Sequence, residues 1–162
     1  MLKFSGPLYV VEDIAVSRRF YEGLLNQKVQ IDFGVNISYE GNFAIHLKSH
    51  YQSLLGEAAE YPVTKRAHNG ELYFETDEID AIYQQLHEAG VEFIHEIREQ
   101  PWAQRVMRFY DPDGHIVEIG ELMDAVVIRL HRQGLSKEQI REKTSMPQEY
   151  VEHVIQEQGK SG

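Results

Sequence analysis

The residues of this sequence that could do chemistry are limited first by the absence of cysteine. Without thiols, disulfides, thiolate metal sites and cysteine nucleophiles are excluded, so any metal must use His, Asp, Glu or other oxygen ligands. Arg105, Arg108, Trp102 and Tyr73 could line a pocket for an anionic or aromatic ligand, through charge-assisted hydrogen bonds and stacking. Because Arg105 and Arg108 fall on opposite faces of one strand, only one can face such a pocket. We expect it to be Arg105; salt bridges to acidic residues and ordinary packing are the alternative.

The composition of the chain indicates what kind of protein it is and which kinds of partner it can bind. The chain has 162 residues, of which 42% are hydrophobic, enough for one buried core or for two small subdomains that share one. Its formal charge of -10 opposes nonspecific binding to nucleic acid or anionic lipid, because both require clustered Lys and Arg. The sequence shows neither a signal peptide nor a membrane-spanning apolar stretch. We therefore expect a cytoplasmic protein whose partner is a small molecule or another protein.

An internal repeat organises most of the chain, and it is seen when the segment from Ser5 is laid over the segment from Gly70. Each copy begins with a strand and passes through an acidic residue into an amphipathic helix; Asp13 is a natural cap for the first helix, and Gly90 should end the second. Three short strands follow each helix, joined by tight polar turns such as DPDGH. The expected strands are residues 8–13, 28–33, 36–40 and 43–49, then 71–78, 91–97, 105–110 and 115–120, with helices at 14–25 and 80–90 and a connector at 49–70 that contains one short helix.

From about residue 121 the pattern becomes wholly helical, with three expected helices at 121–134, 136–145 and 147–158. Ser136 and Gln139 form a capping box, and Pro147 suits the first turn of the last helix. The last two helices resemble a helix-turn-helix, but residues 147–158 contain three glutamates and no Lys or Arg, so DNA phosphate would be repelled. We expect a packed extension that covers the preceding domain or mediates dimer contacts.

The segments VxDIxxSxxFYExLL and PWxQRxxxFYDPDGHxVEIGE resemble the pattern of the vicinal oxygen chelate superfamily, which contains glyoxalases, bleomycin-resistance proteins and extradiol dioxygenases. The resemblance covers residues 4 to about 121. It implies an α+β fold of two βαβββ modules, at about 4–49 and 70–121, whose curved sheets form a barrel-like cavity. The expected domains are residues 1–121 and a helical extension at 122–162. Members commonly associate through their sheets, so the resemblance also implies a homodimer.

The resemblance further implies four cavity-facing positions for metal ligands, one on the first and one on the fourth strand of each module. The matching residues here are Gly6, His46, Glu71 and Glu118, and strand alternation places His46 and Glu118 on the cavity face. Glycine supplies no side-chain ligand. Glyoxalases of this type typically have His or Gln at the first position and His at the third, so this sequence departs from them twice. Extradiol dioxygenases need two histidines and a glutamate, which makes that activity a poor match.

Two functions follow from these positions. In the first, His46, Glu71 and Glu118 hold Zn, Ni, Mn, Co or Fe, and Glu118 or Glu71 moves a proton as general base in a lactoylglutathione-lyase-like lyase or isomerase acting on a substrate with vicinal oxygens. Tyr73, Trp102 and Arg105 would then bind the substrate. In the second, the protein has no metal cofactor and sequesters a small molecule or antibiotic, as bleomycin-resistance proteins do. Gly6 favours the second function, and the three potential ligands favour the first.

Overall fold

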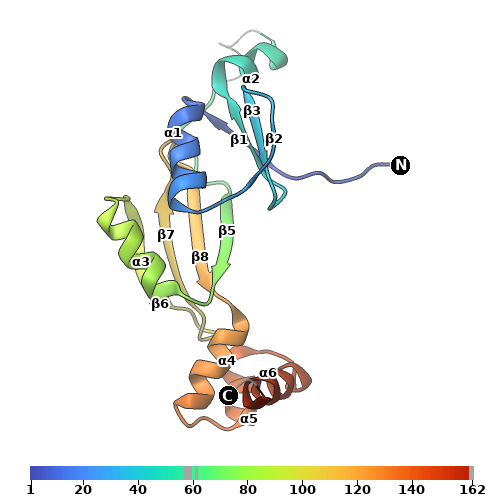
Figure 1. Ribbon diagram of the computed structural model, residues 1–162, viewed down its shortest axis with the longest axis vertical. Helices are drawn as coiled ribbons and strands as arrows, with labels where there is room; N and C mark the ends of the chain where they lie inside the picture. Colours follow the sequence, from blue (N-terminus) through green and yellow to red (C-terminus); the bar gives the residue numbers. More distant parts are fainter. Residues whose placement is uncertain (57–59, 61, 161–162) are drawn as a thin grey trace. The chain divides into compact units, whose positions relative to one another are not determined.

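The computed structural model describes residues 1–56, 60 and 62–160 of the chain. Parts of the expected connector (57–59 and 61) and the end of the expected extension (161–162) lie outside the described residues. The chain divides into two compact units, residues 1–71 with 110–116 and residues 72–109 with 117–162, and each is described by itself. Both combine a four-stranded mixed sheet with helices, which confirms the α+β class (Figure 1).

The first unit is a βαβββ module followed by one more helix. Its elements are β1 (Leu8–Val11), α1 (Ile14–Arg18), which continues into the π-helical turn η1 (Arg19–Leu24), β2 (Val29–Asp32), β3 (Asn36–Tyr39), β4 (Ala44–Leu47) and α2 (Lys48–Leu55). The sheet order is β1-β4-β3-β2, with β1 parallel to β4 and the other pairs antiparallel. Tyr21 of η1 is buried together with Ile37, Tyr39 and Ile45 of the sheet. The apolar stripe expected on the first helix is therefore what attaches it to the sheet.

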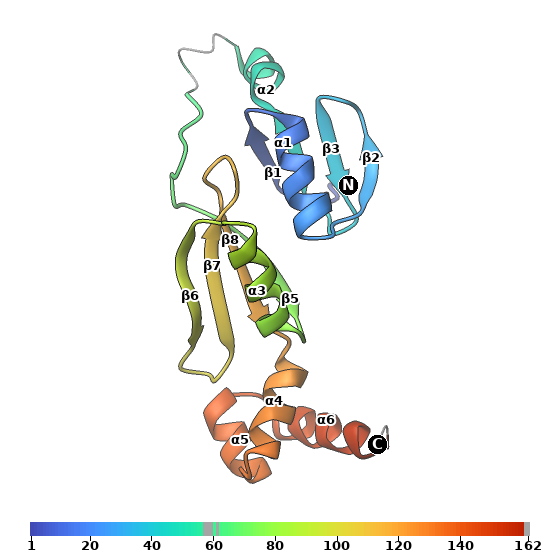
Figure 2. The ribbon, with the colours of Figure 1, turned by 60° about the vertical axis from the view of Figure 1, so that its left-hand side comes forward.

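The second unit repeats the same order of elements. They are β5 (Glu71–Thr76), α3 (Ile79–Glu88), β6 (Phe93–Glu99), β7 (Arg105–Tyr110) and β8 (Ile116–Glu121), and the sheet order is β5-β8-β7-β6. Figure 2 shows α3 lying along one face of this sheet. The equivalent strand orders confirm the two βαβββ modules that the internal repeat predicts.

Three helices complete the second unit, as the helical pattern predicts (Figure 2). They are α4 (Met123–Arg132), α5 (Lys137–Thr144) and α6 (Gln148–Lys160), and we call them the C-terminal extension. Buried apolar residues from all three, including Leu130, Ile140 and Val151, form one cluster. Among the described residues, no helix has the length and apolar content needed to cross a bilayer.

Local signals in the sequence mark where the helices begin and end. The Asp13 carboxylate accepts hydrogen bonds from Ala15 N and Val16 N at 2.7 and 3.1 Å, which confirms the expected cap of α1. The capping box between Ser136 and Gln139 is also present. Several expected boundaries differ from the observed ones by one or two residues. Where a strand over residues 43–49 was expected, β4 ends at Leu47 and α2 begins at Lys48.

Candidate functional site

Glu118 on β8 is a buried carboxylate whose partner is an arginine. It is 5% exposed, and it forms an ion pair with the guanidinium of Arg108 on the neighbouring strand β7. His95 lies beside this pair, with its Nε2 3.3 Å from Arg108 Nη1. A buried charge is tolerated when it is paired, and Arg108 supplies the opposite charge beside Glu118.

A β-bulge decides the face on which His95 lies. Phe93 pairs with Phe109, whereas His95 pairs with Arg108, because the register shifts between Phe93 and His95. Phe93 contacts the ring of Tyr83 on α3, so its side chain is on the helix-covered face. Simple alternation would place His95 on that face too, but the extra residue of the bulge turns it to the opposite face, next to Arg108.

Arg105, the arginine expected to line a pocket, points toward α3. Its guanidinium contacts the Asp80 carboxylate of α3 at 3.0 Å and Glu121 at 2.8 Å. Glu121 is 3% exposed and also pairs with Arg129 at 2.8 Å. Burial by itself raises the pKa of Glu121, but the hydrogen bonds from Arg105 and Arg129 outweigh burial and hold that pKa below its ordinary value. The two arginines therefore do lie on opposite faces, and it is Arg108 that lies on the face opposite α3.

Tyr73 and Trp102 are large aromatic side chains that remain 48% and 43% exposed, and a buried glutamine holds both. Trp102 Nε1 donates to Gln104 Oε1 at 2.9 Å, and Gln104 Nε2 donates to Tyr73 OH at 2.8 Å. Gln104 is 5% exposed and donates also to the backbone carbonyl of Glu121 at 2.7 Å. A Cβ at Gly120 would lie 2.8 Å from Gln104 Nε2, so glycine leaves the space that the glutamine occupies. We call Tyr73, Trp102 and Gln104 the aromatic platform.

His46, the histidine expected to bind metal, is buried in the first unit and makes two hydrogen bonds. Asn36 Nδ2 lies 3.0 Å from His46 Nδ1, and His46 Nε2 lies 2.7 Å from His50 Nδ1. Because an amide nitrogen only donates, His46 Nδ1 acts as the acceptor and the proton of the neutral ring sits on Nε2, directed at His50. Burial, and then the nearby His50, lower the pKa of His46.

Glu71 and Gly6 complete the four positions that the family resemblance singles out. Glu71 is exposed at the start of β5, and its backbone carbonyl accepts a hydrogen bond from Tyr9 OH at 3.2 Å. Gly6 has a φ of 129°, and a Cβ there would lie 1.8 Å from the carbonyl oxygen of Asn42. No residue with a side chain fits at position 6 without moving this backbone.

These environments do not fit a metal ion. The Glu118 carboxylate is neutralised by Arg108, the Nε2 proton of His46 is donated to His50, and Gly6 has no ligand atom. Within each unit, among the residues that the structure describes, no three His, Asp or Glu side chains form a group suited to a metal. The ligand set His46, Glu71 and Glu118 stays a prediction.

The first unit contains a pocket of about 440 Å³, within the size range of small-molecule sites. Its walls come from the segment before β1 and from β2, β3 and β4. Phe4, Ile31 and Phe33 supply exposed apolar surface, while Gln30 and Asn36 supply amide groups. The pocket lining therefore combines apolar rings with several hydrogen-bonding groups.

The DPDGH turn does more than connect two strands: its aspartates also form hydrogen bonds to the first helix of the chain and to the segment before it. The Asp111 side chain is fully buried, and its oxygens accept hydrogen bonds from Tyr21 OH at 2.7 Å and His115 Nδ1 at 2.9 Å, as well as from two backbone amides. Asp113 Oδ1 accepts from the backbone amide of Glu12 at 3.1 Å. The turn therefore anchors the first helix of the chain through polar contacts. In the sequence, two aspartates beside a glycine mark a polar turn, but their partners Tyr21 and Glu12 are distant along the chain.

Comparison with known proteins agrees with this architecture. The family model described as a glyoxalase-like domain matches residues 4–124. The chain belongs to the glyoxalase-like domain family. It is therefore a member of the vicinal oxygen chelate superfamily, as its sequence motifs predict. The C-terminal extension lies almost wholly beyond the matched residues.

Solved structures show the same fold. A protein of unknown function from Agrobacterium tumefaciens str. C58 is 37% identical, with a TM-score of 0.67 over 75% of this chain and 95% of that chain. A glyoxalase-related enzyme from Fulvimarina pelagi is 22% identical (TM-score 0.63, 75% and 90% of the two chains), and a lactoylglutathione lyase from Agrobacterium tumefaciens is 18% identical (TM-score 0.55, 72% and 91%). No curated protein matches the chain. At these identities the last two support the fold alone.

Proposed function

We propose that this glyoxalase-like protein binds a small planar aromatic molecule without a metal cofactor, and that the aromatic platform is the surface that holds it. The observation that carries the proposal is the pair of half-exposed rings, Tyr73 and Trp102, held by the buried Gln104. Exposed aromatic rings in fixed positions are what a planar ligand needs for stacking, which contributes about 0.5–1.5 kcal/mol per ring pair beyond the area buried.

The fixed positions of the two rings matter for affinity. Ordering a free side chain on binding costs about 0.5–1.5 kcal/mol, and hydrogen bonds formed before the ligand arrives reduce that cost. Gln104 makes hydrogen bonds to Trp102, Tyr73 and the Glu121 backbone, so both rings are restrained in the unliganded chain. The platform is therefore preorganised.

In this proposal the residues expected to be catalytic have other tasks. Glu118 serves as the partner of Arg108, and Arg105 joins α3 to the sheet through Asp80. His46 is a hydrogen-bonded residue between Asn36 and His50. None of them needs to move a proton for a ligand to bind.

Trp102 is the sole tryptophan of the chain, so its fluorescence reports directly on the platform. We would titrate the protein with indole, 1-naphthol and riboflavin, in the presence of EDTA, and follow the emission of Trp102. Saturable quenching that Tyr73→Ala weakens supports the proposal. Phe33→Ala is the matched control, because Phe33 is an exposed ring in the pocket of the first unit. Binding that responds to Phe33→Ala and not to Tyr73→Ala would place the ligand in that pocket instead and refute the platform.

The alternative is the metal-dependent lyase or isomerase, with Glu118 or Glu71 as general base and Zn, Ni, Mn, Co or Fe as cofactor. A buried Glu118 is its support, since a cation has to neutralise this carboxylate. Arg108 supplies that cation already. Elemental analysis of purified protein, and calorimetry with Zn²⁺, decide between the two: stoichiometric metal that Glu118→Ala and His46→Ala both weaken would establish the metal site and overturn the metal-free proposal.

We also propose that the protein is a cytoplasmic homodimer. The family membership and the absence of cysteine support this proposal. Sedimentation equilibrium measures the association state directly, and a mass equal to that of one 18.8 kDa chain at micromolar concentration would rule the dimer out.

A further inference from the structure

The core of the C-terminal extension includes a residue that comes from the sheet. Ala103, in the turn between β6 and β7, is 0% exposed and belongs to the same apolar cluster as Val126, Val127 and Leu130 of α4. Its φ of 66° places it in the left-handed region, which is unfavourable for alanine. Because this conformation costs energy, contacts made by the methyl group have to help maintain it.

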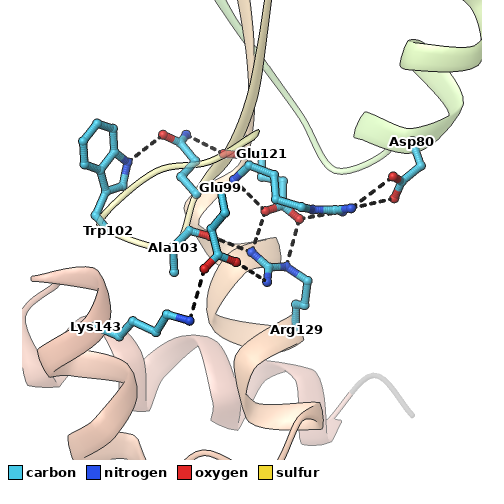
Figure 3. A network of polar contacts seen from close by, with 9 residues as sticks. Asp80, Glu99, Trp102, Ala103, Glu121, Arg129 and Lys143 are labelled. Carbon is cyan, nitrogen blue, oxygen red and sulfur yellow. Dashed lines mark hydrogen bonds and ion pairs between the residues drawn. The ribbon is translucent and has the colours of Figure 1, made fainter. Parts of the chain in front are cut away.

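A network of ion pairs attaches the extension to the same turn (Figure 3). Arg129 of α4 donates to the Ala103 carbonyl at 2.6 Å and to the Glu121 carboxylate at 2.8 and 3.2 Å. Glu99, at the end of β6, forms ion pairs with Arg129 at 3.4 Å and with Lys143 of α5 at 3.2 Å. Two helices of the extension therefore hold the segment that begins at Glu99 and ends just before β7.

This turn carries two of the three residues of the aromatic platform, Trp102 and Gln104. Trp102 directly precedes Ala103, and Gln104 directly follows it. The amide of Ala103 donates to the Gln100 carbonyl at 2.8 Å, which closes the turn around Trp102. The direction in which the Trp102 ring points is thus coupled to the position of Ala103, and Ala103 is held by the extension.

We infer that the C-terminal extension is a positioning element for ligand binding, acting through Ala103 and Arg129 on Trp102. The inference rests on the proposed function for its effect on affinity. The family match ends at residue 124, so α5, α6 and nearly all of α4 are an addition to the shared domain. The extension therefore adjusts this member's platform without contacting the ligand itself.

The test uses the full chain and the variant Arg129→Met, which keeps an unbranched apolar stem and removes all five guanidinium donors. The matched control is Arg141→Met on α5, where the arginine is exposed and contacts only Glu142, at 3.6 Å, among the ion pairs of the described chain. Two quantities are measured: acrylamide quenching of Trp102 without ligand, and the affinity for riboflavin by calorimetry. Circular dichroism verifies that each variant is folded.

We expect Arg129→Met to raise the acrylamide quenching constant of Trp102 about twofold, because the turn opens locally. Riboflavin affinity should fall about fivefold, because the Trp102 side chain would no longer be held in place before binding and its ordering would then cost free energy on binding. Arg141→Met should change neither quantity. A purely structural role would lower the melting temperature of Arg129→Met and leave quenching and affinity at wild-type values, and that result overturns the inference.

Two further outcomes are distinguishable. If wild-type protein binds none of the aromatic probes, the proposed function fails, while the quenching constant of Trp102 still decides whether the extension positions the turn. If Arg129→Met does not fold, Ala103→Gly takes its place, since glycine suits a φ of 66° and only the methyl contact is lost. Unchanged quenching in Ala103→Gly then contradicts the inference.

Discussion

The substitution Asp111→Asn changes the buried carboxylate at the start of the DPDGH turn. The Asp111 side chain has no exposed surface and accepts four hydrogen bonds. Asparagine keeps one oxygen for the two backbone amides of residues 113 and 115. It replaces the other oxygen by an NH₂ group, which faces two donors, Tyr21 OH and His115 Nδ1. Both partners must then reorient or lose their bond.

The magnitude follows from the two bonds that change. A hydrogen bond to a charged group contributes about 1.5–3 kcal/mol, so losing both costs about 3–6 kcal/mol. A neutral amide costs less free energy to bury than a carboxylate, and this difference offsets part of the lost stability. We therefore expect Asp111→Asn to lower the free energy of unfolding by about 3 kcal/mol. Tyr21→Phe removes one of the same bonds and should cost about 1.5–3 kcal/mol. The double variant should be less than additive, because both substitutions remove the Tyr21–Asp111 bond.

The assay is urea unfolding of wild type, both single variants and the double variant, repeated from pH 7 to pH 3. Burial raises the pKa of Asp111, but the hydrogen bonds from His115 and Tyr21 outweigh it and hold the pKa below the ordinary 3.8. A lowered pKa means that the stabilising contribution is complete above the unfolded-state value and is lost as the pH falls through the folded-state value. The difference between wild type and Asp111→Asn should therefore shrink only below about pH 4.

The control is Asp77→Asn, because Asp77 is exposed in the turn before α3. A surface change of this kind should stay within about 0.5 kcal/mol. If Asp111→Asn costs no more than Asp77→Asn, or if its difference from wild type is the same at pH 3 and pH 7, the account of the DPDGH turn as a buried anchor is wrong.

Three more substitutions have outcomes that the structure specifies. Gly6→Ala should destabilise the chain by more than 2 kcal/mol, as an approximate lower bound read by urea unfolding, because the new Cβ would lie 1.8 Å from Asn42 O and the φ of 129° disfavours alanine. Ser136→Ala should cost about 1 kcal/mol in the same assay, through loss of the helix cap; no change would mean that the cap contributes nothing. Arg108→Met leaves Glu118 buried without its cation, so the melting temperature should fall, and added Zn²⁺ should restore it only if a metal can take the place of the guanidinium.

Local patterns in the sequence determined the two modules. The periodicity of the helices, the cap at Asp13 and the repeated strand pattern are confirmed because they depend on contacts within a few residues, which the sequence displays directly. The capping box at Ser136 is confirmed for the same reason. The motif around DPDGH identified the superfamily, but nothing local to that turn indicates that Asp111 meets Tyr21, ninety positions away.

The candidate site depended more on tertiary structure. Alternation correctly separated Arg105 from Arg108, but the choice between them required the position of Asp80 on α3. His95 changed face because a bulge inserts one residue into β6, and the pattern of apolar residues does not show a bulge.

What the sequence by itself determined about this protein is the order of its elements, the helix caps and the family, all of which rest on short-range periodicity and motif. Only the tertiary structure decided which charges are paired and which rings are held. Glu118 meets Arg108 across two strands, and Ala103 packs under helices that follow it by more than twenty residues. These contacts join segments distant along the chain, and they form only after the sheet and the C-terminal extension have packed, because no local preference brings such segments together.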